Sequence, residues 1–170
     1  MGKRLVQQAM NGDSEALEIV LKENYQQLYK TAYLYVKNEA DALDIVQEAI
    51  IKILKKLDTL TYPEYFTTWA VRIVIYSSLD FIKKNGKQFS VLEEQVIEPE
   101  KQLSREECLD IYDAIARLPK HLQEITILHY FCGKKLKEIS EVMHEPLGTT
   151  KYKLYEARLK LRNYLEEDDQ

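Results

Sequence analysis

The segment of residues 133–162 constrains the fold most strongly. A short helix is predicted over 134–142, a turn over 143–147 that contains Pro146, and a second helix from Gly148 onward. The second helix is basic, and Glu156 is its only acid before Glu166; its cations are Lys151, Lys153, Arg158, Lys160 and Arg162. A helix, a turn and a second basic helix form the device that places side chains in a DNA major groove. The pattern therefore predicts a helix-turn-helix unit.

Two groups of side chains in this unit are candidates for DNA contact. The second helix begins with exposed backbone N–H groups, which favour phosphates or base edges, and cations on the first helix are expected to contact phosphates and set the register. The candidates are Lys135, Lys137, Thr149, Thr150, Lys151, Lys153, Tyr155 and Arg158. The alternative interpretation is that the basic helix is only a solvated face.

The composition excludes several classes of protein. The net charge of -4 over 170 residues is wrong for a chain held to DNA by bulk electrostatics, so DNA contact must be local or depend on a partner. Cys108 and Cys132 lack the spacing of a zinc site, and motifs for phosphate cradling, nucleophilic catalysis or metal hydrolysis are missing. We expect no catalytic residue, metal, cofactor or small-molecule substrate. The apolar run near Trp69 is broken by Arg72, so the chain is predicted to be neither secreted nor membrane-inserted.

The periodicity predicts an all-α fold of two small helical domains. In the first, residues 1–87, helices are expected after a cap at Asp13 or Ser14, from Asp41, and over 66–84. Residues 88–103 are acidic and poor in bulky apolar side chains, which predicts a flexible linker. The second domain, residues 104–170, is expected to have helices over 105–117, 120–131, 134–142 and 148–165, the last two forming the helix-turn-helix.

The helix from Asp41 carries an isoleucine on its polar side. Its apolar positions form one stripe that is expected to be buried, comprising Ala42, Ile45, Val46, Ala49, Ile50, Ile53, Leu54 and Leu57. Ile51 lies on the other face, with Asp44, Gln47, Glu48 and Lys55. A lone exposed isoleucine is ordinary, yet an isoleucine ringed by carboxylates and an amide is also typical of a small protein–protein contact. The pattern alone leaves both interpretations open.

The helix over 66–84 combines aromatic residues with cations. Trp69, Arg72, Tyr76 and Lys83 share one side, an arrangement that suits single-stranded nucleic acid because bases stack on rings while cations follow phosphates. The simpler interpretation of Phe66 and Trp69 is a structural role in the core. Lys83 and Lys84 fit phosphate contact and capping of the helix dipole equally well.

Taken in order, these residues resemble an extracytoplasmic-function sigma factor, the small two-domain promoter-recognition subunit of bacterial RNA polymerase. The segments that carry the resemblance are Gly12-Asp13 with Ala16-Leu17, the DALDIVQE run from Asp41 to Glu48, Phe66-Thr67-Thr68-Trp69 with Arg72-Ile73, Asp80 to Lys84, Leu118-Pro119, Gly148 to Lys151 and Ala157-Arg158. One such motif is weak evidence, whereas the ordered series covers nearly the whole chain.

The resemblance implies a role for each candidate face. The helix from Asp41 would dock on core RNA polymerase through Asp41, Asp44, Gln47, Glu48, Ile51 and Lys55. The melted minus-ten element would be bound, with a flipped base held by the loop 61–65, through Tyr62, Glu64, Tyr65, Phe66, Trp69, Arg72, Tyr76, Lys83 and Lys84. The linker would thread toward the polymerase interior, and the helix from Gly148 would read the minus-thirty-five element.

The family also implies an anti-sigma factor as a partner, a cytoplasmic location in which that factor can hold the chain at the inner membrane face, and a stress or cell-envelope regulon. The chain departs from the family where Tyr76 replaces a frequent Asn, Thr150 a usual Val and Tyr152 a usual small Ser. Base preference therefore cannot be copied from relatives. The rival interpretations are a stand-alone helix-turn-helix regulator and a helical interaction protein without a DNA role.

Overall fold

The structure, a computed structural model, describes residues 2–85, 111 and 113–168, with the side chains of 167 and 168 excepted. All regular structure in these residues is helical, so the predicted all-α fold is confirmed. The linker predicted over 88–103 lies outside the described residues, as does most of the helix predicted over 105–117. The part of that predicted helix from 113 to 117 is described, and it is helical.

The first unit consists of α1 (Lys3–Met10), α2 (Ser14–Val36), α3 (Glu39–Lys56) and α4 (Phe66–Lys84). The loop between α3 and α4 contains two single-turn 3₁₀ helices, η1 (Leu57–Thr59) and η2 (Pro63–Tyr65). Three helices were predicted here, and α1 was not among them; Val6 and Ala9 on α1 are buried against the rest of the unit.

Capping side chains set where α2 and α3 begin. The Asp13 carboxylate accepts a hydrogen bond from the backbone N–H of Ala16 at 3.0 Å, as predicted for an N-cap at this turn. The expected start of the next helix at Asp41 is two residues late, because the Asn38 side chain is the N-cap and accepts from the backbone N–H of Asp41 at 2.9 Å. Asp41 therefore lies in the first turn, where a carboxylate interacts favourably with the helix dipole.

The second unit contains α6 (Lys120–Thr126), a π-helical turn η3 (Ile127–Phe131), α7 (Leu136–Val142) and α8 (Leu147–Asp168). The π turn is closed by the backbone N–H of Cys132, which donates to the carbonyl of Ile127 at 3.0 Å. Gly133 follows with a φ of 63°, in the left-handed region that glycine adopts without steric cost. This turn redirects the chain from α6 into the helix-turn-helix formed by α7 and α8.

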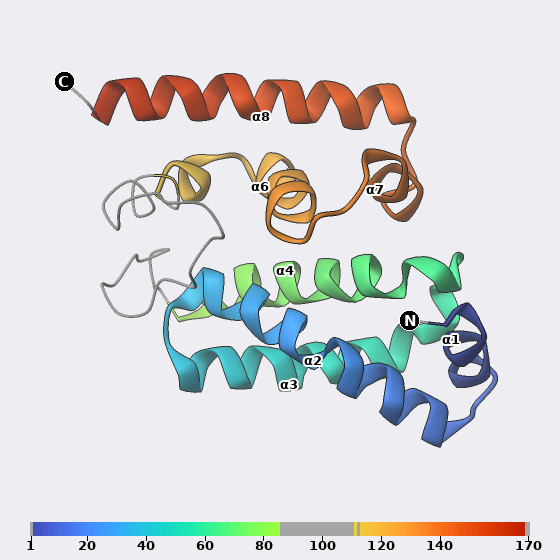
Figure 1. Cartoon of the computed structure of the whole chain (residues 1–170). Helices are drawn as coiled ribbons and strands as arrows, with labels where there is room; N and C mark the ends of the chain where they lie inside the picture. Colours follow the sequence, from blue (N-terminus) through green and yellow to red (C-terminus); the bar gives the residue numbers. More distant parts are fainter. Residues whose placement is uncertain (1, 86–110, 112, 169–170) are drawn as a thin grey trace.

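The two units pack directly on each other. In Figure 1, α4 lies between α2 and α3 on one side and the second unit on the other, and both α7 and η3 contact α4. The buried side chains of the first unit continue without interruption into those of the second, which contributes Ile125, Ile127, Leu128, Ile139 and Leu154 to the same apolar cluster. This packing was not predicted from the sequence. The packing determines which of the candidate surfaces are exposed.

Candidate nucleic-acid and protein-docking surfaces

The outer face of α3 presents an apolar stripe to solvent. Leu43, Ile51 and Leu54 are exposed by 37%, 52% and 48%, and the exposed Gln47 lies between the first two along the helix. Ile51 is exposed, as predicted. Leu54 was assigned to the buried stripe, and this assignment is wrong because its side chain is exposed. The buried members of α3 are Ala42, Ile45, Val46, Ala49 and Ile53, which already fill the face toward α2 and α4.

Charged groups border this stripe, which we call the α3 docking face. Asp44 and Lys55 are exposed, and Asp41 is half-buried in the first turn. The Glu48 carboxylate forms an ion pair with Lys52 at 2.8 Å. This hydrogen bond lowers the pKa of Glu48. Lys52 in turn donates to the Ser77 hydroxyl of α4 at 3.0 Å. Glu48 therefore helps to hold α3 on α4 as well as bordering the face.

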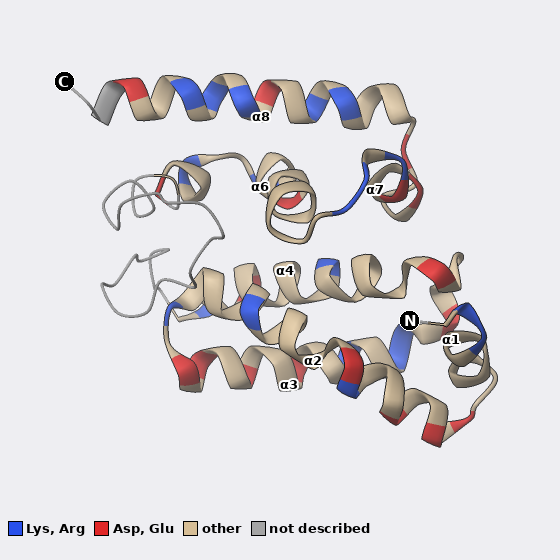
Figure 2. Ribbon diagram, viewed as in Figure 1, with Lys and Arg blue, Asp and Glu red and all other residues tan. Residues whose placement is uncertain are grey.

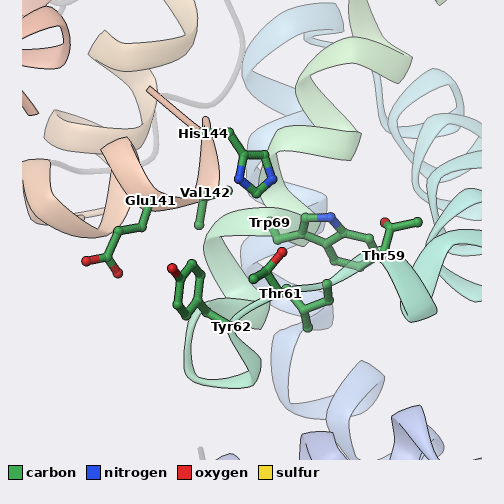
Figure 3. A pocket seen from close by; sticks show the side chains of 8 residues that line it. Thr59, Thr61, Tyr62, Trp69, Glu141, Val142 and His144 are labelled. Carbon is green, nitrogen blue, oxygen red and sulfur yellow. The ribbon is translucent and has the colours of Figure 1, made fainter. Parts of the chain in front are cut away.

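The aromatic residues around the loop 59–65 lie at the junction of the two units. Tyr62 is exposed, and Trp69 on α4 is half-buried. Figure 3 shows a pocket in which both residues lie opposite the end of α7 and the turn that follows it; its lining is Thr59, Leu60, Thr61, Tyr62, Trp69, Glu141, Val142 and His144. Tyr65 bonds to Glu141 of α7, which raises the pKa of the Tyr65 phenol. Glu64 pairs instead with Lys3 of α1 at 3.4 Å.

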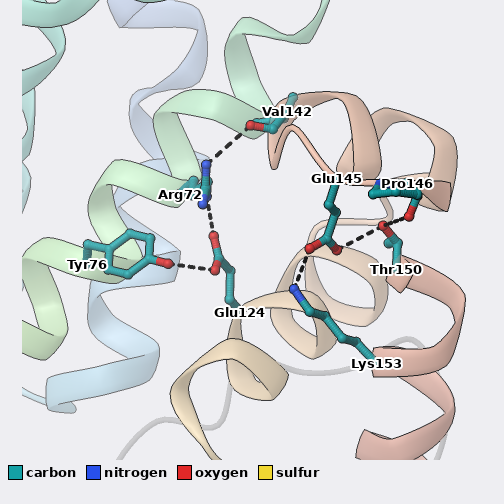
Figure 4. A network of polar contacts seen from close by, with 8 residues as sticks. All are labelled: Arg72, Tyr76, Glu124, Val142, Glu145, Pro146, Thr150 and Lys153. Carbon is teal, nitrogen blue, oxygen red and sulfur yellow. Dashed lines mark hydrogen bonds and ion pairs between the residues drawn. The ribbon is translucent and has the colours of Figure 1, made fainter. Parts of the chain in front are cut away.

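Arg72 and Tyr76 project from α4 toward α6 and meet one carboxylate. Glu124 is only 1% exposed; the Arg72 Nε donates to one of its oxygens and the Tyr76 hydroxyl donates to the other at 2.8 Å (Figure 4). The Arg72 Nη1 also donates to the carbonyl oxygen of Val142 at 3.2 Å. Burial, together with the bond to Glu124, raises the pKa of Tyr76. Arg72 and Tyr76, both predicted to contact minus-ten DNA, are thus brought together by Glu124 of the second unit.

One further predicted DNA contact is buried, and two are exposed. Phe66 is fully buried in the core of the first unit, and its ring packs beside that of Trp69, with centroids 6.0 Å apart. Its direct contact with DNA finds no support in this arrangement, because no surface of the ring is open. Lys83 and Lys84 are exposed in the last turn of α4, where they also complement the helix dipole.

The helix-turn-helix is braced at its turn by Glu145. One carboxylate oxygen accepts from the Thr150 hydroxyl at 2.9 Å, and the other pairs with the Lys153 ammonium (Figure 4). Thr150 is fully buried and serves the turn, so its predicted base contact also finds no support in this arrangement. Lys153 also serves the turn, through its ion pair with Glu145. The turn contains His144 with a φ of 54°.

The remaining predicted residues of this unit are exposed. Lys135 and Lys137 flank the start of α7, and Thr149, Lys151, Tyr155 and Arg158 lie on the open side of α8. The Arg158 Nε donates to the Tyr130 hydroxyl, and the guanidinium also lies 5.7 Å from the centre of that ring. Lys and Arg are distributed along α8 in Figure 2. Tyr152, which was noted only as a departure from the family, is exposed by 65% on the same helix.

Metal-ligand groups and membrane-spanning helices can be sought in the part of the chain that the structure describes. Within that part, His, Cys, Asp and Glu side chains form no group of three suited to a metal ion. No helix among the described residues is both long and apolar enough to cross a membrane.

The sequence matches two family models, Sigma-70 region 2 over residues 20–88 and Sigma-70, region 4 over residues 108–161. The chain is a sigma factor of the sigma-70 family. It is 34% identical to RNA polymerase sigma factor SigV of Bacillus subtilis, over 88% of this chain and 90% of that one. It is 25% identical to the ECF RNA polymerase sigma factor SigW of the same organism, over 97% of each chain. These matches place it in the extracytoplasmic-function group.

Solved structures share the fold. CnrH in complex with the cytosolic domain of CnrY has a TM-score of 0.69 at 20% identity, with 98% of this chain and 97% of that chain covered. The sigma factor RpoE of Bartonella quintana, in complex with the anti-sigma factor NepR, has a TM-score of 0.61 at 21% identity, with 88% and 96% covered. Matches to both regions of a sigma factor do not favour a stand-alone helix-turn-helix regulator.

Proposed function

We propose that this sigma factor binds bacterial core RNA polymerase through the α3 docking face. The supporting observation is the exposed stripe of Leu43, Ile51 and Leu54 among acids and an amide. Apolar side chains held outward on a rigid helix, with a charged rim, have the anatomy of a protein interface. We propose that residues 1–87 and 104–170 act as the two promoter-binding domains and that 88–103 connects them.

The same proposal assigns the DNA contacts. Melted minus-ten DNA would contact the exposed or half-buried side chains of the loop 61–65 and of α4, namely Tyr62, Glu64, Tyr65, Trp69, Arg72, Tyr76, Lys83 and Lys84. Duplex minus-thirty-five DNA would contact Lys135, Lys137, Thr149, Lys151, Tyr155 and Arg158. Promoter opening then follows from differential binding of separated strands, without a catalytic residue, metal or cofactor of this chain. We further propose a cytoplasmic location and an anti-sigma partner, as in the complex of RpoE with NepR.

Substitution of Ile51 tests the docking face. Ile51→Glu places a charge at the centre of the stripe and should weaken core-polymerase binding at least about tenfold, since a charge buried in an interface is costly. Ile19→Glu is the matched control, because Ile19 is 40% exposed on a different helix, α2. Binding is measured by titration of labelled sigma factor with core enzyme. Equal affinities for the two variants would remove the α3 docking face from the proposal.

A further inference from the structure

One cation of α8 is directed back toward the turn that precedes the helix. The Lys153 ammonium forms an ion pair with one carboxylate oxygen of Glu145, and the other oxygen accepts a hydrogen bond from the Thr150 hydroxyl at 2.9 Å (Figure 4). The side chains of Lys153 and Glu145 are only 21% and 14% exposed. Lys151, on the same helix, is exposed. Lys153 is therefore held within the protein, whereas Lys151 faces solvent.

Lys153 lies where it could contribute to the proposed minus-thirty-five surface. It follows Thr149 by four residues, so the two side chains share a face of α8. Thr149 is exposed at the leading end of the helix, where DNA phosphates or base edges are expected. The lysine stem is flexible, so its ammonium can turn from a carboxylate to a nearby phosphate. The ion pair with Glu145 thus decides where this charge is used.

The physical balance favours Glu145 over a phosphate as the partner of Lys153. A contact with an exposed phosphate is weakened by water and by salt, whereas a mostly buried pair is screened much less. Transfer of the ammonium to DNA would also leave the Glu145 carboxylate without its cation in a mostly buried site, which costs free energy. This cost opposes contact between Lys153 and DNA.

We propose that Glu145 is an internal counter-anion that withholds Lys153 from DNA, so that α8 loses the phosphate contact that this lysine would make. The inference rests on the proposed minus-thirty-five surface. Phosphate contacts carry no sequence information, so withholding the charge lowers the affinity for every duplex alike. Glu145 is in this sense a positioning residue, because it acts on DNA binding through Lys153.

The salt dependence of duplex binding tests this proposal. Each phosphate contact steepens the fall of log affinity with log salt concentration by about 0.9. The full chain is titrated with a short fluorescent DNA duplex of mixed sequence at several salt concentrations. Glu145→Gln releases Lys153, so it should steepen the dependence by about 0.9 and raise the low-salt affinity at least about threefold. Glu166→Gln, exposed on α8, makes the same change in net charge and should leave the steepness unchanged.

Two lysine variants separate release of the charge from a general loosening of the turn. Lys153→Gln should bind duplex within about twofold of the parent, since its charge is already withheld. Lys151→Gln should weaken binding at least about threefold and flatten the salt dependence by about 0.9. Adding Lys153→Gln to Glu145→Gln should cancel the gain, whereas a gain that came from a loosened turn would persist.

A salt dependence of Glu145→Gln equal to that of Glu166→Gln would overturn the proposal. Equal losses of affinity in Lys153→Gln and Lys151→Gln would overturn it independently, and this comparison leaves Glu145 in place, so it decides the question even where Glu145→Gln does not fold. Unchanged binding in both Lys151→Gln and Lys135→Gln would instead remove the minus-thirty-five surface from the proposed function, and the inference with it. The two failures are therefore distinguishable.

Discussion

Lys37 occupies an unusual backbone position at the end of α2. Its φ of 49° places it in the left-handed region where helices commonly end, a position that usually belongs to glycine. Burial of the side chain lowers the pKa of its ammonium from 10.5 to about 8. The folded state therefore releases this proton at a lower pH than the unfolded chain does.

The free energy of unfolding should rise with pH because of Lys37. Between pH 8 and 10.5 the unfolded chain binds more protons at this residue than the folded chain, so raising the pH favours folding. Lys37→Gln keeps a non-glycine residue at the same φ but removes the charge. Between roughly pH 7 and 9.5, the free energy of unfolding of the parent should rise by about 1 to 2 kcal/mol relative to that of this variant.

Urea unfolding of both proteins at the two pH values measures this gain. Lys30→Gln is the control, because Lys30 is exposed on the same helix and should give parallel pH dependence to the parent. A constant difference in unfolding free energy between the parent and Lys37→Gln would contradict the assigned effect of burial.

At the scale of secondary elements, Glu145 holds together the turn of the helix-turn-helix. Its two oxygens join Thr150 and Lys153 of α8 to the end of the turn. Glu145→Gln removes the charge that both contacts favour, and should lower the free energy of unfolding by about 1 to 2 kcal/mol. Glu156→Gln on α8 is the matched control. Thermal and urea unfolding should separate the two variants, and coincident transitions would show that the turn does not depend on this carboxylate.

The boundaries of most helices could be predicted because local signals set them. Periodic apolar residues gave α4 its bounds of Phe66–Lys84, and the Asp13 cap gave the start of α2. The orientation of Leu54 was beyond such signals. A helix with many apolar positions presents a stripe wider than its neighbours can cover, and only the positions of α2 and α4 decide which side chains are left exposed.

Long-range polar contacts explain the remaining differences at the candidate site. The Thr150 hydroxyl could contact a base or hold the turn of the helix-turn-helix. It does the second in this structure, and the only sequence signal for that role is its partner Glu145. Glu124 was not singled out. Its signal was a lone acid beside Leu122, Ile125 and Leu128, matched by the lone cation Arg72 in the apolar run of α4. Opposite charges isolated in two apolar segments are the pattern expected of a buried ion pair.

For the whole molecule, the packing of the two units determines which of the three proposed binding surfaces are exposed. Ile51 of the α3 docking face and Lys151 and Arg162 of α8 are exposed at the same time, while α4 is packed between α3 and the second unit. The acidic net charge of -4 disfavours DNA binding by the free chain.

The packing of the two units predicts that loss of the Glu124 contacts does not change polymerase binding. Ile51 is exposed while the units are packed together, so Glu124→Arg gains no new docking surface and should bind core enzyme within about twofold of the parent. Glu166→Arg, an exposed charge reversal on α8, is the control for the added charge. Titration of each labelled variant with core enzyme gives the affinities. A gain in polymerase affinity of about tenfold for Glu124→Arg alone would show that the packing of the two units also covers a polymerase contact.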